Sequence, residues 1–467
     1  MKVVKVTYPL RLTISLLALA LSITGVSQQP KAVFIPLDAA QPTLKGFSDT
    51  LPPELRSPPD AEAWSFWVKT QDSAIRQRLE KGEEDTLTNL LRWGVTFTDE
   101  YQIDREYLSK YGTSTLVNAF AEKRANDLVR ALSSPGANEG MQQMRAYLVH
   151  RGYSFKTPED RAKVKRHLLE NLAHMRDEFA EFREKLKTAD LSEESQLYAQ
   201  RGISLDSNLW PDYALDRSLG ELVKLGMIKP GSVRRIAIIG PGLDFANKEF
   251  GNDFYPPQST QPFAVLDSLI RLGLTDARNF ELYTLDISPS VNIHIARTQK
   301  NAADGKPYVV QLPWNSEVPF SQEYFTAFEN WWQTLGDQIG TPAKPVLVPV
   351  KLAQNVHIRA VSIRPDIAKR ITPVDMNAVF QHLDGTDADQ KFDLIIGTNI
   401  FIYYGAFEQS LARANLSAML KPGGFALSND MLADKVPTRL LEVHRTNLEV
   451  RSDPQIIEHV YCYQREP

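Results

Sequence analysis

Residues 235–246 read RIAIIGPGLDFA, and this stretch decides the fold that the sequence predicts. Four apolar residues, Ile236 to Ile239, run directly into Gly240-Pro241-Gly242. A short unbroken apolar run is typical of a strand buried on both faces of a parallel sheet. Glycines directly after such a strand allow a tight turn and let a ligand approach the backbone closely. For the turn alone, a tight connection without a ligand is the alternative interpretation.

Strands and helices alternate from this point on. This pattern predicts an α/β fold with a Rossmann-like, doubly wound, mostly parallel sheet. Near the end of the chain, the alternating segments Thr446–Val450 and His459–Tyr463 indicate a C-terminal antiparallel hairpin. The strands expected in the parallel part are 235–239, 280–285, 357–363, 392–397 and 425–428.

The chain begins with a targeting pattern. Basic residues precede an apolar run from Leu12 to Val26, which is shorter than the roughly 20 residues that span a bilayer as a helix. Residues 1–27 are therefore interpreted as a signal peptide or N-terminal anchor, and export to the periplasm or the extracellular space is expected. An uncleaved anchor, with membrane contact only through residues 12–26, and a mis-started reading frame are the alternatives.

Two further regions precede the sheet. Residues 28–59 are rich in proline and are interpreted as a linker. Residues 60–200 show helical periodicity and predict an all-α domain, with Trp64, Phe66 and Trp67 as core aromatics. The apolar seam of the helix at 158–187 indicates packing in a bundle, with dimerisation as the alternative. Residues 201–467 then form the sheet-containing domain.

Composition excludes several classes of function. The 467 residues include 53 basic and 57 acidic residues, a formal net charge of −4, whereas a general nucleic-acid binder would be strongly basic. The single cysteine, Cys462, excludes an intrachain disulfide and a cysteine-rich zinc site. The eight histidines form no ligand pattern, so no metal is expected.

Polar residues follow four of the expected strands. In open α/β sheets ligands bind at the carboxyl ends of the strands, near the point where strand order reverses. A carboxylate at the end of the second strand has two acceptor oxygens, which suits the two hydroxyls of a ribose. The residues predicted to bind a nucleoside cofactor are Gly240, Gly242, Asp244, Asp286, Asp375, Met376, Asn377 and Asn399.

The second half of the chain resembles class I S-adenosylmethionine-dependent methyltransferases. The segment Asn399-Ile400-Phe401-Ile402-Tyr403-Tyr404 and the turn Leu420-Lys421-Pro422-Gly423-Gly424 are most similar to the chemotaxis-receptor (CheR-type) branch. The resemblance implies S-adenosyl-L-methionine as cofactor and methyl transfer to an acceptor that the sequence does not identify. No general base is assigned, and Asn399 and Tyr403 are the candidates for lining the acceptor side.

The sequence also departs from that family. Ile238 and Asp244 stand where the family's first motif has an acid and a third glycine, and Thr398 stands where the branch has arginine. The helical N-terminal half shows no match to receptor-methylating relatives, so methylation of protein glutamates is not carried over. An exported enzyme would also be separated from a methyl donor made in the cytosol. A non-catalytic binding or scaffold protein on a degenerate methyltransferase fold is therefore the alternative function.

Single residues have structural alternatives as well. Asp286 could cap a turn, Asp375 could cap a helix over Met376 to Leu383, and Asn399 could hold a loop. A third function, a nicotinamide-dependent oxidoreductase, is disfavoured because Phe245 replaces the third small residue of the dinucleotide fingerprint.

Overall fold

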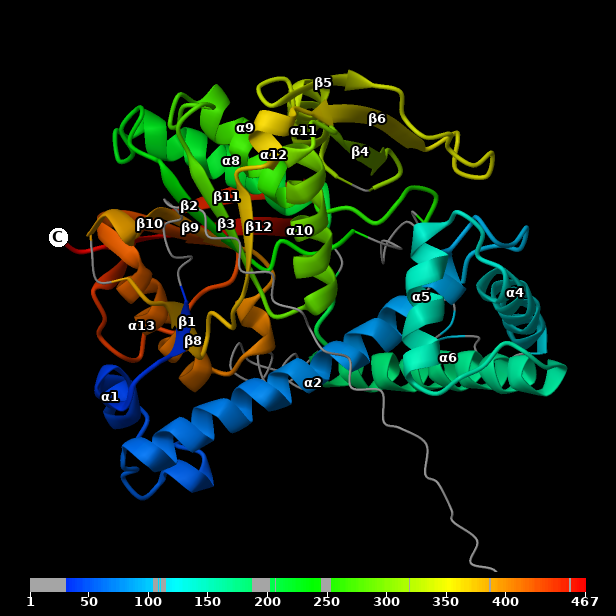
Figure 1. The fold of residues 1–467 in the computed structure, drawn as a ribbon, viewed down its shortest axis with the longest axis horizontal. Coiled ribbons are helices and arrows are strands. Elements are labelled where there is room, and N and C mark those ends of the chain that lie inside the picture. The colour runs from blue at the N-terminus through cyan, green and yellow to red at the C-terminus, as the bar shows by residue number, and fades with distance from the viewer. Residues whose placement is uncertain are drawn as a thin grey trace, which may run out of the picture.

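The computed structural model describes residues 31–467 except 104–107, 109, 111–114, 187–201, 206, 245–252, 319, 386–387 and 453–454. The predicted signal peptide or anchor lies outside the described residues. Within the described part of the chain, no helix has both the length and the apolar character needed to cross a membrane. Figure 1 shows a sheet-centred region connected by one long helix, α2, to a group of helices.

A seven-stranded sheet with the order β11-β12-β10-β9-β2-β3-β7 forms the centre. The chain adds β3 and β7 on one side of β2 and then β9 and β10 on the other, so strand order reverses between β2 and β9. This mainly parallel α/β sheet agrees with the predicted fold class. Its parallel strands are β2 (Arg235–Ile239), β3 (Glu281–Asp286), β7 (Ile371–Asp375), β9 (Phe392–Gly397) and β10 (Leu420–Ser428).

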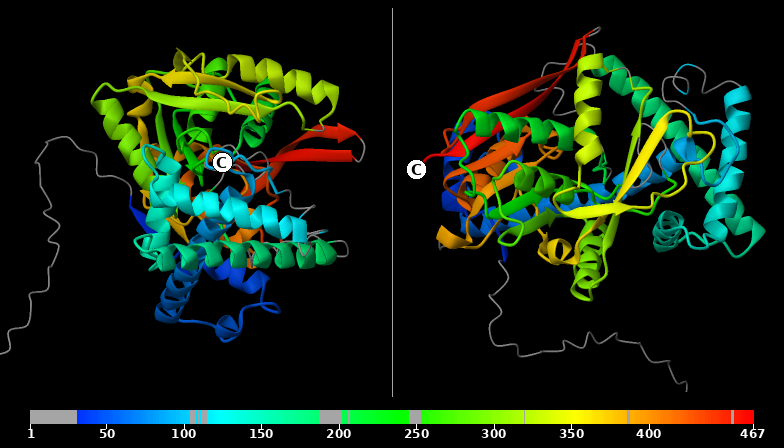
Figure 2. Two further views of the ribbon diagram at one scale, coloured as in Figure 1. Left: turned by 90° about the vertical axis from the view of Figure 1, so that its right-hand side faces the viewer. Right: turned by 90° about the horizontal axis from the view of Figure 1, so that it is seen from above.

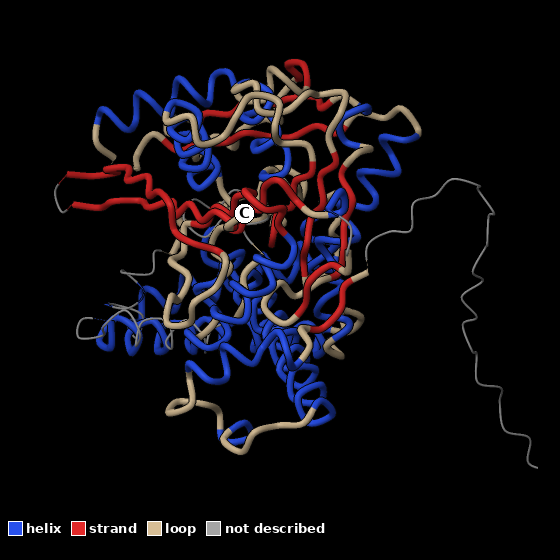
Figure 3. Tube along the Cα trace, turned by 90° about the vertical axis from the view of Figure 1, so that its left-hand side faces the viewer, coloured by secondary structure: helices blue, strands red, loops and turns tan. Residues whose placement is uncertain are grey.

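The last two strands, β11 (Leu440–Ser452) and β12 (Gln455–Arg465), form an antiparallel hairpin. β12 lies between β11 and β10 and runs antiparallel to both. Because Ser428 at the end of β10 pairs with Tyr461, residues 455–460 extend past the carboxyl edge of β10. Figures 2 and 3 show the hairpin projecting from the body of the protein.

Helices cover both faces of the sheet. Ile236 and Ile238 of β2 pack with α8 (Leu209–Lys224) and α9 (Gln261–Arg271), whereas Ala237 and Ile239 pack with α13 (Ala406–Met419) on the other face. Successive side chains of a strand point to opposite faces, so an unbroken apolar run supplies both cores. This is why 235–239 could be identified as a strand from sequence.

The predicted third strand is wrong. Residues 357–363 belong to β6 (Val356–Ile363), the middle strand of a separate antiparallel sheet with β4 (Tyr308–Asn315) and β5 (Gly340–Ala343). That sheet, α10 (Pro289–Ala303), α11 (Gln322–Thr334) and α12 (Pro365–Ala368) lie between β3 and β7 in the chain. The true third strand is β7, whose Pro373 lacks an N–H group; proline is tolerated there because β7 is an edge strand.

The predicted linker at 28–59 is also wrong for the residues that the structure describes. Strand β1 (Ala32–Phe34) pairs with β8 (Gln381–Leu383), and α1 (Leu37–Gly46) and the short helix η1 (Pro53–Leu55) follow. The Trp64 indole N–H donates to the Ile35 carbonyl at 2.8 Å, and Ile35 and Leu44 are buried in the core under α13. The prolines shape a folded segment, so this stretch is part of the sheet domain.

Helix α2 (Ala61–Trp93) crosses the predicted domain boundary. Trp64 and Trp67 near its start are buried in the sheet domain, whereas Leu87 and Leu90 near its end are buried among α4 (Thr115–Ser133), α5 (Glu139–His150) and α6 (Pro158–Leu186). Figure 1 shows α2 running from α1 to this helical group. Residues 60–200 therefore do not form a separate unit, because one helix contributes to both cores.

The first half of the apolar seam of α6 packs against other helices of the same chain. Val164, Leu168 and Leu172 are buried in the core shared with α2 and α4. This packing is the bundle that the seam predicts, and a dimer through the same helix stays a prediction. Phe66, expected in the core, is instead 74% exposed on the opposite side of α2.

We expect Trp64→Ala to lower the free energy of unfolding by roughly 3 to 5 kcal/mol, because a buried aromatic side chain is lost from the core. Trp64 is 1% exposed and stacks on Trp67 at a centroid distance of 5.3 Å. Phe66→Ala on the same turn of α2 should stay within about 0.5 kcal/mol of the wild type. Urea unfolding followed by circular dichroism measures both; equally small losses would restore the linker interpretation for the segment under Trp64.

Candidate functional site

Both glycines of the turn after β2 adopt left-handed backbone conformations. Gly240 has φ = 61° and Gly242 has φ = 72°, a region that favours glycine. A Cβ atom at Gly242 would lie 2.7 Å from the Leu205 carbonyl oxygen, and one at Gly240 would overlap the side chain of Ile400. Other atoms do approach the glycine backbone closely, as the sequence predicts, but they belong to Leu205 and Ile400 of this chain and not to a ligand.

Asp286 lies at the end of β3 and is directed at the glycine turn. It is buried, its Oδ1 accepts a hydrogen bond from the Ser288 N–H at 2.7 Å, and the Gly242 N–H also donates to it. Burial raises the pKa of this carboxyl to about 7, and the neighbouring Asp375 adds to the increase, whereas the two N–H donors oppose it. A buried acceptor that titrates near neutrality therefore faces the turn.

Asp375 is opposite Asp286 in register, at the end of β7, but its carboxylate lies at the rim. Its side chain is 61% exposed and pairs with the Arg76 guanidinium of α2 at 2.7 Å. Arg76 also pairs with Asp72 at 2.9 Å and donates to the Ile287 carbonyl at 3.2 Å. The prediction that Asp375 contacts a cofactor is not supported by this placement, because Asp375 does not line the cavity described below.

Met376 and Asn377 follow β7 in a turn, and no helix forms over 376–383. The Asn377 amide oxygen accepts from the Val379 N–H at 3.1 Å, and its nitrogen donates to Asp72 at 2.9 Å. Both residues line the cavity. The hydrogen bonds of the Asn377 side chain therefore stabilise its own turn and attach α2.

Asp244 and Asn399 are predicted ligand contacts that the structure places elsewhere. The Asp244 carboxylate accepts from the Tyr255 hydroxyl at 2.7 Å, within a backbone bridge to Gln258. Asn399 has φ = 57° and is exposed, and its amide oxygen accepts from Asn429 at 2.8 Å. Neither lines the cavity, so both hold loops.

The predicted residues that do converge surround one small cavity. It has a volume of about 50 Å³ and lies at the carboxyl edge of the sheet next to the point of strand reversal. Tyr403, the second acceptor-side candidate, lines it together with Ile400 and Tyr404. The cofactor-side residues on its wall are Gly240, Gly242, Asp286, Met376 and Asn377.

Part of the wall comes from residues that sequence reasoning did not assign to the site. Leu79 of α2 and residues 203–205 close the cavity, and we call α2 residues 72–82 together with residues 202–205 the cover. The Leu243 N–H donates to the Leu205 carbonyl at 2.7 Å, and the Ile203 N–H donates to the Arg78 carbonyl at 3.2 Å. The first bond attaches residues 202–205 to the glycine turn, and the second holds the two parts of the cover together. No motif marks these residues, because helical periodicity does not show which surface a helix packs against.

A second polar group lies beneath the point of strand reversal. The Gln261 side chain donates to Thr398 at 2.8 Å and to Asp212 at 3.1 Å. Burial raises the pKa of Asp212 to about 7. Asp212 lies in the first turn of α8, where acidic residues are common, so no sequence signal marked it.

The chemistry of these residues suits an adenosine-containing cofactor, but the cavity is too small to hold one. A buried carboxylate beside a glycine turn suits ribose hydroxyls, whereas small-molecule pockets typically measure about 300 to 1,000 Å³. A cavity of about 50 Å³ holds only a few water molecules. In the described conformation the cover therefore excludes such a cofactor. The described residues also contain no cluster of three or more His, Cys, Asp or Glu side chains that could hold a metal.

The sequence matches no protein-family model and no curated protein. Similar solved structures include the N-methyltransferase NodS from Bradyrhizobium japonicum WM9 with S-adenosyl-L-homocysteine, at 12% identity over 62% of this chain and 99% of that one, with a TM-score of 0.26. Another is magnesium protoporphyrin IX methyltransferase from Synechocystis PCC 6803 with bound SAM, at 11% identity over 60% of this chain and 86% of that one, also with a TM-score of 0.26.

The raised pKa of Asp286 predicts a specific pH dependence of stability. Between its unfolded pKa near 4 and its folded pKa of about 7, the native state holds the extra proton, so this residue's contribution to stability falls as pH rises. Asp286→Asn removes that dependence. Relative to the wild type, the variant should therefore gain roughly 2 to 3 kcal/mol between pH 5 and pH 8. Urea unfolding at both pH values measures the gain, with the exposed Asp304→Asn as control; a constant difference between variant and wild type would contradict the prediction.

Proposed function

We propose that this chain binds S-adenosylmethionine at the carboxyl edge of its sheet and transfers the methyl group to an acceptor, once the cover has moved. The observation that carries the proposal is the buried Asp286 carboxyl facing the N–H of Gly242, beside the reversal of strand order. Sheets of this type bind ligands at that point. The chemotaxis-receptor branch and the acceptor are not assigned by this argument.

The lining residues have distinct parts in the proposed complex. Asp286 would accept hydrogen bonds from the ribose, the turn at Gly240 and Gly242 would allow close approach, and Met376 would contact the base. The cofactor would supply a methyl group already activated by its sulfonium charge. The chain would then position the acceptor and exclude water, with Tyr403 on the acceptor side.

The closed cover favours the second candidate, a non-catalytic binding or scaffold protein. Leu79 and residues 203–205 fill the position beside the glycine turn, and Arg76 neutralises Asp375. A protein that never binds the cofactor has no need to keep this edge open. Export through the predicted signal peptide would favour the same alternative, because the methyl donor is cytosolic.

Calorimetric titration with S-adenosylhomocysteine separates the two candidates. For the full chain we expect micromolar binding, and Asp286→Asn should weaken it at least tenfold, because an uncharged amide replaces the carboxylate that pairs with two hydroxyls. Asp304→Asn, which lies outside the cavity, should leave the affinity unchanged. Absence of binding at millimolar ligand would favour the scaffold protein.

The cover predicts an unusual gain of affinity. Arg76→Met removes the ion pairs to Asp375 and Asp72 but keeps the length of the side chain, so it weakens the attachment of α2 to the sheet edge. A partly exposed ion pair contributes about 0.5 to 1 kcal/mol, so S-adenosylhomocysteine should bind roughly two- to fivefold tighter. Arg130→Met, which breaks an ion pair with Asp127 within α4 and outside the cover, is the matched control. Weaker binding by Arg76→Met would show that Arg76 supports the ligand.

A further inference from the structure

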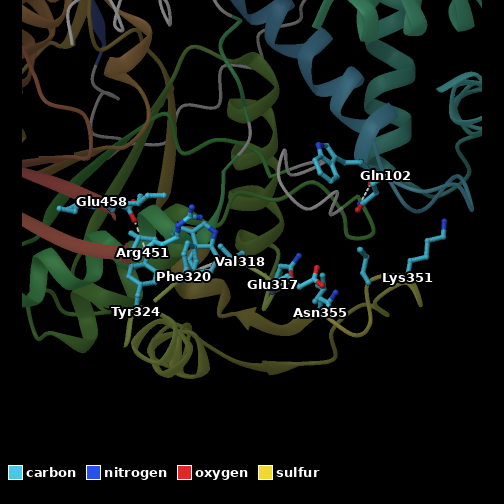
Figure 4. Close-up of a pocket in the computed structure, with 17 residues that line it drawn as sticks. Gln102, Glu317, Val318, Phe320, Tyr324, Lys351, Asn355, Arg451 and Glu458 are labelled. Atoms are coloured by element: carbon cyan, nitrogen blue, oxygen red, sulfur yellow. Dashed lines mark hydrogen bonds between the residues drawn. The ribbon is translucent and has the colours of Figure 1, made fainter. Parts of the chain in front are cut away.

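A much larger cleft lies between three parts of the chain. It has a volume of about 800 Å³, within the range of small-molecule sites. Trp93 at the end of α2 lines one side, residues 450–451 and 456–458 of the β11–β12 hairpin another, and residues of the insertion such as Asn315, Phe320 and Lys351 a third. Figure 4 shows side chains from the hairpin, among them Arg451 and Glu458, at one end, and Lys351, Asn355 and Gln102 towards the other. No sequence motif pointed to this cleft.

One wall of the cleft is aromatic. The Trp210 ring lies 4.5 Å from that of Phe320 and 6.4 Å from that of Tyr324, measured between centroids, and all three residues line the cleft. Aromatic side chains supply large contact areas for flat apolar groups. This wall favours a ligand with a flat aromatic or apolar body.

Among the residues that the structure describes, two polar side chains that line the cleft each have a donor without an acceptor. The buried Nε of Arg451 has no hydrogen-bond partner, and among the described residues the guanidinium forms no ion pair. Within the described part of the chain, the buried indole N–H of Trp93 also has no partner. Buried donors are rarely left unpaired, and a guanidinium binds carboxylate or similar anions most strongly. The Arg451 guanidinium, which lines the cleft without a paired carboxylate among the described residues, therefore indicates a ligand with a negatively charged group.

The other charged groups of the cleft are less available. The Glu458 carboxylate accepts from the Tyr324 hydroxyl at 3.4 Å, and Lys351 already donates to the Thr98 carbonyl at 2.6 Å. Glu317 is exposed at the opening. Arg451 is thus the charged side chain of the cleft with the fewest partners among the described residues. A positively charged group in that position favours an anionic ligand over a cationic one.

We propose that this cleft binds a small amphipathic anion, with its flat body against Trp210 and Phe320 and its charged group at Arg451. The inference does not depend on methyl transfer, because the cleft is separate from the small cavity and needs no movement of the cover. The site lies at the same edge of the sheet: Trp210 is two residues from Asp212, which is linked through Gln261 to Thr398 at the end of β9.

The probe for the test is 8-anilinonaphthalene-1-sulfonate, a flat aromatic anion whose fluorescence increases in apolar sites. The full chain, without cofactor, should bind it at one site with micromolar affinity. Arg451→Gln should weaken binding at least tenfold, because a charge-assisted contact is lost. Arg278→Gln, an exposed arginine before β3 and outside the cleft, should bind as the wild type does.

A neutral probe with the same rings, N-phenyl-1-naphthylamine, separates charge recognition from loss of folding. Its affinity should change less than twofold in Arg451→Gln and fall at least fivefold in Trp210→Ala, provided that circular dichroism shows the folded state in both variants. The proposal is overturned if the sulfonate binds without saturation, if Arg451→Gln binds it as the wild type does, or if both probes weaken equally in Arg451→Gln.

Discussion

The attachment of helix α2 across the carboxyl edge of the sheet is the interaction on which the site depends. Asp72 and Arg76 contact the carboxyl ends of two strands and the connections that follow them, at Asp375 and Asn377 for β7 and at Ile287 for β3. These contacts follow the burial of Trp64 and Trp67 one to three turns earlier, which fixes the direction of the helix. An edge that would otherwise be an open ligand crevice is therefore closed by an element from the other end of the chain.

This closure changes the electrostatics of the two strand-end carboxylates. Asp286 and Asp375 are neighbours in register, and two buried like charges at that distance would repel each other. The structure separates their roles, because Arg76 neutralises Asp375 at the rim while burial favours the protonated form of Asp286 inside. A ligand that offers hydroxyl donors to Asp286 would favour its ionised form, so binding and loss of that proton are linked. Both carboxyls have partners within the chain, which is why the cover fits both an enzyme and a binding protein.

Sequence identified the parts of the fold whose pattern is local. Strands 235–239 and 392–397 have apolar runs that serve both faces, and the structure has them with the same bounds. Sequence reasoning failed where the position of a strand in the folded protein determines its residues. Pro373 made the edge strand β7 resemble a loop, and the alternating residues of β6 resembled a strand of the main sheet. Within the site, Gly240, Gly242 and Asp286 follow from the strand ends, whereas the positions of Asp244, Asp375 and Asn399 depend on partners such as Tyr255, Arg76 and Asn429. No local pattern specifies those partners.

The small cavity and the large cleft share one structural element. Leu79 closes the first and Trp93 lines the second, and both belong to α2. Fourteen residues of helix separate them, a distance of about 21 Å at 1.5 Å per residue. A helix held by hydrogen bonds along its length transmits rotation or translation with little internal deformation. Any movement of α2 that opens the space beside Gly242 must therefore also displace Trp93, unless the helix bends between the sheet core and the bundle core. The sequence of α2 contains no proline, and its Gly82 is packed against the backbone of Ile203, so no obvious hinge uncouples the two ends.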